Sequence, residues 1–156
     1  MDISNELLIL ITASLPVSEL RGAIPLGLLH LKEPILKVVF LSILGNILPV
    51  APILFLLQPV SEKLRRFKLW NRFFDWLFER TRRKAGLIEK YEAIGLALFV
   101  AIPLPITGAW TGCIAASLFK IRFRYAFWSI ILGITIAAVI VTTLCLSGIW
   151  IYNSAH

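Results

Sequence analysis

Four apolar runs, at residues 7–31, 36–58, 94–119 and 126–152, constrain what this chain can fold into. About 20 apolar residues are needed to cross the ~30 Å hydrocarbon core of a bilayer, so each run is long enough to do so. The chain is 58% hydrophobic and only 16% charged, which is too few charges for the polar shell that a soluble domain of 156 residues needs. We therefore predict an all-α integral membrane protein that forms a single membrane domain.

The first run contains groups that a simple membrane-spanning helix excludes. The stretch ASLPVSELRGAIPLG, residues 13–27, carries Glu19, Arg21, Pro16 and Pro25. Irregular backbone is tolerated at membrane depth only where protein or water surrounds it. We therefore expect this run to form a re-entrant helical hairpin, which enters the membrane, breaks at the prolines and returns to the same side.

Local rules place the ends of the two hairpin helices. The residue before a proline avoids the helical region, so the first helix should end before Pro16. Ser18 is well placed to be the N-cap of the returning half-helix, whose first turn would then consist of Glu19, Leu20 and Arg21.

The second half of the chain repeats this pattern when residues 104–146 are laid over residues 15–57. LPITGAWTGCIAA then faces LPVSELRGAIPLG, and a Phe-x-Ser helix with a later glycine follows in both halves. Two apolar segments share leucine and isoleucine easily, but they share a Leu-Pro-x-Ser/Thr turn much less easily. We therefore interpret the two halves as an internal repeat.

The repeat predicts a second re-entrant hairpin over residues 94–119. Pro103 and Pro105 are expected to break its helix, as Pro16 does in the first hairpin. Thr107 is expected to cap the return, which continues through Gly108, Ala109 and Trp110.

Charge decides how the two repeats are oriented. Residues 61–92 hold ten Lys or Arg against five Asp or Glu, and the second hairpin is followed by Lys120, Arg122 and Arg124. Suppose that the first run of each half enters the membrane and returns, and that only the second run of each half crosses it. Both basic segments then lie on one side, which the positive-inside tendency makes cytoplasmic. Four full crossings would put them on opposite faces. We therefore predict an inverted repeat in a prokaryotic-type cell membrane, with residues 61–92 and 120–124 cytoplasmic and both termini outside.

Residues 61–84 have the pattern of an amphipathic helix. Polar side chains recur three and four residues apart, beside an apolar face that is rich in phenylalanine and tryptophan. A helix with a cationic and an aromatic face suits the plane of the lipid headgroups, where each cation gains ~1 kcal/mol from anionic lipid. The alternative is a solvated helix that packs on the protein's own membrane part.

Two half-helix N-termini would meet near the midplane if both hairpins form. Each presents unpaired N–H groups and about half a positive charge, and Arg21 adds a full one. Such a site suits a phosphate or a carboxylate, as in the broken helices of transporters. The residues predicted to bind substrate are Arg21, Ser18, Thr107, Gly108, Trp110 and Asn46.

Glu19 and Asn46 each leave two interpretations open. A carboxylate at membrane depth is costly and indicates a functional site, so Glu19 could exchange protons as substrate comes and goes. It could also be a structural tie, paired with Arg21 or bonded to backbone amides at the tip. Asn46, which is polar at mid-span, either lines the same cavity or makes one hydrogen bond between helices.

At these residues the chain resembles the family of small multidrug export proteins. ELRGAIPLG (19–27) and AIPLPITGAWTG (101–112) are similar to the two signature stretches of that family, and the resemblance covers nearly the whole chain. Ile106 stands where the family pattern has glycine. The family is distantly similar to the DedA superfamily, which implies two facing re-entrant hairpins and either proton-coupled carriage of lipid-linked phosphates or scrambling of phospholipids. The positions matched by this resemblance are Glu19, Arg21, Pro103, Pro105, Thr107, Gly108 and Trp110.

We therefore expect a transporter or flippase, proton-coupled through Glu19, that moves an anionic or amphiphilic substrate such as a lipid phosphate past the hairpin tips. The alternative is an energy-independent phospholipid scramblase or a membrane-organising protein. An enzyme is not expected, because no His-Glu-x-x-His, paired aspartates or Gly-x-Ser-x-Gly occurs. The two cysteines, Cys113 and Cys145, have no metal or disulfide spacing, so no metal and no cofactor are expected. The expected partners are membrane lipid, with anionic headgroups at residues 61–84, and a second copy of the chain in a homodimer, but no nucleic acid.

Overall fold

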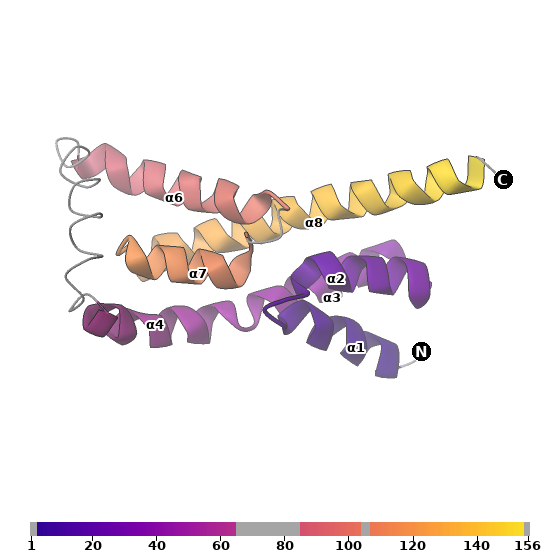
Figure 1. Ribbon diagram of the computed structural model, residues 1–156, viewed down its shortest axis with the longest axis horizontal. Coiled ribbons are helices and arrows are strands. Elements are labelled where there is room, and N and C mark those ends of the chain that lie inside the picture. Colours follow the sequence, from indigo (N-terminus) through magenta and orange to yellow (C-terminus); the bar gives the residue numbers. More distant parts are fainter. Residues whose placement is uncertain (1–2, 65–84, 104–106, 155–156) are drawn as a thin grey trace.

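The computed structural model describes residues 3–64, 85–103 and 107–154, and all regular structure within them is helical (Figure 1). The elements are α1 (Ile3–Ser14), α2 (Glu19–Pro25), the π-helical turn η1 (Leu26–His30), α3 (Ile35–Ile47), α4 (Val50–Leu64), α6 (Ala85–Ala101), α7 (Ala109–Leu118) and α8 (Phe123–Ser154). The predicted all-helical fold is confirmed for this part of the chain.

Two segments are long and apolar enough to cross a membrane. Ile35–Leu57, which comprises α3 and the first part of α4, has 23 residues, and Phe123–Gly148 in α8 has 26. The sequence predicts spans at residues 36–58 and 126–152, and these two candidate segments lie within a few residues of them. Together with the composition, these two helices indicate a membrane protein.

The other two apolar runs are each broken into two helices. α1 ends at Ser14, before Pro16, and the next helix, α2, begins at Glu19. α6 ends at Ala101, just before Pro103, and α7 follows after a non-helical stretch. Pro105 lies outside the described residues. In Figure 1 both breaks lie near the middle of the long axis of the molecule.

Pro25 does not break the first hairpin, contrary to the prediction. It is the last residue of α2, and η1 follows it without interruption. Proline has no N–H to donate to the carbonyl of Arg21, four residues earlier, so the regular α ladder cannot continue through this point. The chain stays helical by widening into a π turn, in which the Leu31 N–H donates to the Leu26 carbonyl at 3.0 Å.

The boundaries around the linker also differ from expectation. α6 begins at Ala85, nine residues before the apolar run that predicts it, because Glu89, Lys90 and Glu92 are compatible with a helix even though they are polar. Residues 61–64 form the end of α4. The remainder of the predicted amphipathic helix, residues 65–84, lies outside the described residues.

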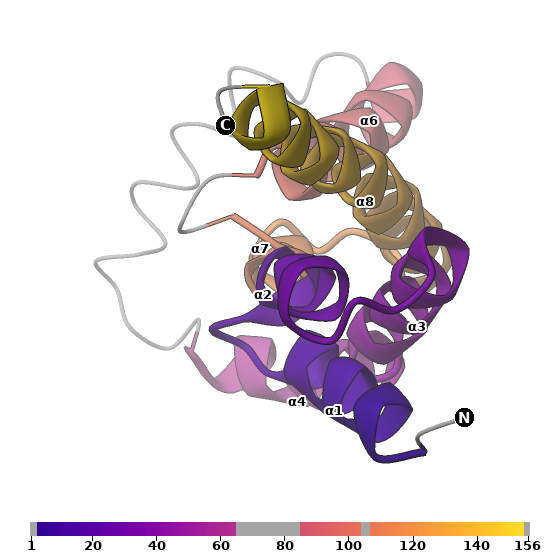
Figure 2. The same cartoon turned by 90° about the vertical axis from the view of Figure 1, so that its right-hand side faces the viewer.

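Each hairpin packs on the span that follows it and also on the span of the other half. α1 packs on α3 and α6 on α8, while α2 also packs on α8 and α7 on α4. Figure 2 shows α2 between α1 and α8, in the centre of the bundle. The buried core runs through all of these helices; its largest fully buried side chains are Ile9, Leu20, Ile24, Ile130, Ile134, Val38, Val50, Val100, Asn46, Cys113 and Ser42.

Two glycines allow one helix to approach the backbone of another. A Cβ added to Gly45 in α3 would lie 2.5 Å from the carbonyl oxygen of Leu10 in α1. A Cβ added to Gly133 in α8 would lie 2.7 Å from the carbonyl oxygen of Ala97 in α6. Small residues let membrane helices approach to backbone contact in this way. The sequence comparison of the two halves pairs these two glycines, and they make corresponding contacts.

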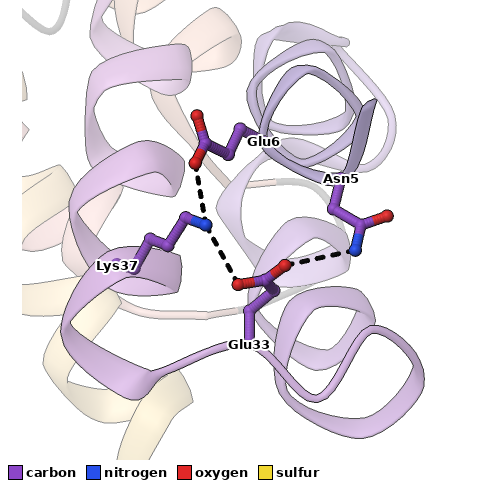
Figure 3. A network of polar contacts seen from close by, with 4 residues as sticks. All are labelled: Asn5, Glu6, Glu33 and Lys37. Atoms are coloured by element: carbon purple, nitrogen blue, oxygen red, sulfur yellow. Dashed lines mark hydrogen bonds and ion pairs between the residues drawn. The ribbon is translucent and has the colours of Figure 1, made fainter. Parts of the chain in front are cut away.

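A polar network joins the outer ends of α1 and α3 (Figure 3). The Lys37 Nζ lies 2.8 Å from an oxygen of Glu6 and 3.0 Å from one of Glu33, and the Asn5 Nδ2 donates to the other Glu33 oxygen at 3.1 Å. The Asn5 amide, with Lys37 second, holds the pKa of the Glu33 carboxyl below its ordinary value. The network therefore fixes the start of the first helix against the start of the first span.

Candidate functional site

The starts of α2 and α7 face each other where the two helix breaks meet (Figure 1). Glu19, the first residue of α2, is only 6% exposed. Its Oε2 accepts a hydrogen bond from the backbone N–H of Ala109 at 3.4 Å, and its Oε1 accepts one from that of Trp110 at 3.3 Å. These are the first two amides of α7, which have no partner within their own helix. Glu19 therefore caps a helix that lies about ninety residues further along the chain.

Gly108 makes room for this cap. A Cβ added at this position would overlap the Glu19 carboxylate, because all three of its nearest heavy atoms belong to that group. Gly108 occupies the N-cap position of α7, with no side chain of its own to satisfy the helix amides. The carboxylate from α2 takes the place that the side chain of an N-cap residue usually fills.

The backbone at Glu19 is strained. Its φ is 48°, in the left-handed region that residues other than glycine rarely occupy. Such conformations persist where the surroundings hold them, and they gather at functional sites. Here the two amides of α7 hold the side chain, and the Glu19 N–H donates to the Leu15 carbonyl at 3.0 Å.

Arg21 reaches the other side of the second helix break. Its Nη2 donates to the hydroxyl of Thr107 at 3.1 Å and to the carbonyl oxygen of Ile102 at 3.3 Å. Thr107 also donates its hydroxyl hydrogen to the Ile102 carbonyl. The guanidinium thus holds both ends of the segment between α6 and α7, and it remains half-buried within reach of the Glu19 cap.

A third contact between the hairpins was not predicted. The indole N–H of Trp110 donates to the carbonyl oxygen of Ser14 at 3.2 Å, and the Ser14 hydroxyl donates to the carbonyl oxygen of Gly45 at 2.9 Å. Trp110 therefore links α7 to the end of α1, and through it to α3. The only signal in the sequence is a serine placed directly before the Leu-Pro turn.

Of the two predicted caps, Ser18 has the predicted N-cap position but makes no capping hydrogen bond, and Thr107 has neither the position nor the bond. Ser18 has helical backbone angles and makes no cap; its hydroxyl donates to the carbonyl oxygen of Thr12 at 2.6 Å. Thr107 lies one residue before the N-cap position, which Gly108 occupies, and its hydroxyl is turned toward Ile102 and Arg21. Each hydroxyl instead donates to the backbone carbonyl of a residue five or six positions earlier in the chain.

Asn46 is 1% exposed and has no hydrogen-bond partner in the described structure. The same holds for the hydroxyl of Ser42, one turn earlier on α3. The single hydrogen bond between helices that the sequence suggested for Asn46 is therefore not formed here. No three His, Cys, Asp or Glu side chains come together as a metal site among the residues that the structure describes.

Comparison with known proteins gives a family but no characterised relative. No curated protein and no solved structure matches the chain. A family model matches residues 19–140, which begin at the Glu19 cap, end well inside α8 and include the second helix break; α1 and the first break precede the matched residues. By that match the chain belongs to the family described as "putative small multi-drug export protein".

Proposed function

We propose that the protein is a proton-coupled transporter or flippase for an anionic, amphiphilic substrate such as a lipid phosphate. The name of the family points to export across a membrane. The observation that carries the proposal is the Glu19 carboxylate bound to the first two amides of α7, next to the Arg21 guanidinium. This arrangement places an acid, a base and a helix N-terminus together between two broken helices.

The proposal includes two re-entrant hairpins related by an inverted repeat, as in the DedA superfamily. Its support is the direction of the chain in Figure 1, where α1 begins at one end of the long axis and α6 begins at the other. α8 ends at the same end at which α1 begins, and the turn between α7 and α8 lies at the opposite end. The matching contacts of Gly45 and Gly133 also favour this relation.

The start of α7 is suited to an anion. A helix N-terminus carries about half a positive charge and presents N–H groups that point at a ligand. Here those N–H groups already hold a carboxylate, which is the chemistry that the site would offer to a phosphate. Arg21 provides a planar donor group of the kind that binds phosphate oxygens in pairs.

Competition between Glu19 and the substrate for these amides would couple substrate binding to proton binding. When Glu19 takes up a proton it loses its negative charge, and its hold on the amides of Ala109 and Trp110 weakens. The amides then become free for the substrate anion, so proton and anion bind together. Among the described residues, Arg21 in α2 acts on Glu19 by its charge, and the Glu19 charge in turn acts on the buried Cys113 in α7.

Flux into proteoliposomes tests the proposal. The substrate is dodecyl phosphate, the driving force is an imposed pH gradient, and a pH-sensitive dye inside the vesicles reports proton movement. We expect wild-type flux to follow the gradient and to carry protons. Glu19→Gln should reduce the gradient-dependent flux at least tenfold. Glu33→Gln, which removes a carboxylate just before the start of α3, is the matched control and should keep the gradient-dependent flux.

Two results would contradict the coupling. One is flux that ignores the gradient in the wild type and survives Glu19→Gln. The other is equal exchange of lipid in both directions without any gradient, which would favour the alternative of a phospholipid scramblase. Absence of any phosphate binding or flux would contradict the anionic substrate itself.

A further inference from the structure

Two polar side chains of α3, Ser42 and Asn46, are fully buried and have no hydrogen-bond partner among the described residues. This holds for the Ser42 hydroxyl and for both polar atoms of the Asn46 amide. Unpaired polar groups are costly to bury, and the hydrocarbon around a membrane helix cannot bond them either. Three such atoms on neighbouring turns of one helix therefore indicate a small polar ligand.

The spacing of the two side chains fits a single water molecule. Ser42 and Asn46 are four residues apart, so they lie on the same face of α3 with their Cβ atoms ~5–6 Å apart. Two hydrogen bonds of about 2.8 Å, placed end to end, span a similar distance. The Asn46 amide has both a donor and an acceptor, and the Ser42 hydroxyl can serve as either. A water between them can therefore bond to both side chains.

The helix that faces Ser42 presents a short side chain. A Cβ added to Gly27 in η1 would lie 2.6 Å from a methyl of Val38, so these two residues face each other. α2 and η1 run antiparallel to α3 and pack on it (Figure 1). Four residues back from Gly27 is Ala23, and four residues on from Val38 is Ser42, so Ala23 lies at the level of the Ser42 hydroxyl. The buried Ala23 offers that hydroxyl only a methyl group.

The same register gives the depth of Asn46 in the molecule. Eight residues on from Val38 is Asn46, and eight residues back from Gly27 is Glu19, which is about 12 Å along either helix axis. Asn46 therefore lies at about the depth of the Glu19 cap, near the middle of the long axis of the molecule. At this depth lipid cannot hydrate the amide.

We propose that Ser42 and Asn46 hold a resident water molecule inside the bundle, at the depth of Glu19. Buried waters typically make about three hydrogen bonds to buried polar groups that are otherwise unpaired, and Ser42 and Asn46 supply three such atoms. A substrate headgroup is a poorer match, because the enclosed Asn46 offers it no open face. The inference does not rest on the proposed function, and it gives Asn46 a role other than the substrate contact that the sequence predicts.

NMR of the full chain in nanodiscs tests the water site. The signal is the cross-peak between the side-chain amide protons of Asn46 and the water resonance, and Asn46→Leu assigns it. A bound water gives NOE and ROE cross-peaks of opposite sign, whereas exchange of amide protons with bulk water gives peaks of the same sign. We expect opposite signs in the wild type. No cross-peak, or peaks of the same sign, would overturn the inference without the need for a further variant.

Removing the second partner tests the bridge. Ser42→Ala should reduce the Asn46 cross-peak to water at least threefold, because the water then loses one of its two side chains. Thr135→Val is the matched control, since the Thr135 hydroxyl already donates to the Ile131 carbonyl of its own helix at 2.9 Å. It should leave the cross-peak unchanged. An equally strong cross-peak in folded Ser42→Ala would contradict a water shared by the two side chains.

Saturating dodecyl phosphate separates a water site from a substrate site. We expect the Asn46 cross-peak to persist in its presence, because the site is enclosed. Loss of the peak on adding dodecyl phosphate would show that Asn46 faces the substrate, and it would overturn the inference.

A crystal structure gives an independent test. The expected density lies between the Ser42 Oγ and the Asn46 amide, within hydrogen-bond distance of both. A direct hydrogen bond from Asn46 to the backbone of a neighbouring helix, with no such density, would overturn the water site.

Discussion

Replacing Gly108 by alanine is the most direct test of the contact between Glu19 and α7, because it changes no charge. The added methyl group would occupy the position of the Glu19 carboxylate. That carboxylate is the end of a flexible side chain, so it can move aside rather than force the backbone apart. The expected result is a protein that still folds but has lost both hydrogen bonds to the amides of Ala109 and Trp110.

The size of the effect follows from those two bonds. Hydrogen bonds to charged groups contribute about 1.5–3 kcal/mol each, and the long N···O distances of 3.4 and 3.3 Å favour low values. We expect Gly108→Ala to lower the free energy of unfolding by about 2–3 kcal/mol, which is about 30- to 150-fold in the unfolding equilibrium constant. Equilibrium unfolding in mixed detergent micelles measures this quantity.

A double-mutant cycle with Glu19→Ala isolates the contact. Alanine is a poorer N-cap than glycine, so part of the loss does not depend on Glu19. In the Glu19→Ala background only that part should remain, and the coupling energy between the two positions should be about 2 kcal/mol. If Gly108→Ala costs the same free energy in both backgrounds, Glu19 does not cap α7 and the reasoning fails.

Three further outcomes follow from the same structure. Gly45→Ala should lower the free energy of unfolding by about 1–3 kcal/mol in the same micelle assay, because its Cβ would press on the carbonyl oxygen of Leu10; an unchanged value would contradict the close contact of α1 and α3. Arg21→Lys should weaken phosphate binding about tenfold in calorimetry, since a lysine ammonium lacks the planar pair of donors that a guanidinium offers to phosphate oxygens; equal affinity would show that only charge matters there. Asn5→Ala should raise the pKa of Glu33 toward its ordinary value of 4.5, measured by NMR titration of the carboxyl. Because the folded pKa is the lower one, the stability that Glu33 contributes is full above pH 4.5 and is lost as the pH falls through the folded pKa. If the loss of stability at low pH occurs at the same pH in Asn5→Ala as in the wild type, Lys37 alone lowers the pKa of Glu33.

The sequence predicted the features that depend on length and on local backbone chemistry. The two spans follow from the number of consecutive apolar residues, and the end of α1 at Ser14 follows from the restriction that Pro16 places on the residue before it. The same reasoning failed at Pro25. A proline forbids one hydrogen bond, but the sequence does not show whether the chain stops there or widens into a π turn.

The contacts between the hairpins could not be predicted from local rules. Ser18 and Thr107 have the right chemistry and the right spacing for caps, and a rule that considers only neighbours in sequence selects them. The actual cap of α7 comes from Glu19, because tertiary packing brings its carboxylate to the amides of a helix far along the chain. Backbone bonding of Glu19 was one of the two interpretations open from the sequence, but its partner amides were not identifiable.

The long separation between Glu19 and Ala109 has a consequence for biosynthesis. The acid emerges from the ribosome 90 residues before the first amide that will bind it, a delay on the order of 5–20 s at usual rates of translation. During that interval no part of α7 exists, so the nascent first hairpin must carry an unsatisfied acid, for which the uncharged form is the cheaper one to insert into lipid. Folding can then be completed only after the last third of the chain has been synthesised. Chains that terminate before α7 should be recognised and degraded as unassembled.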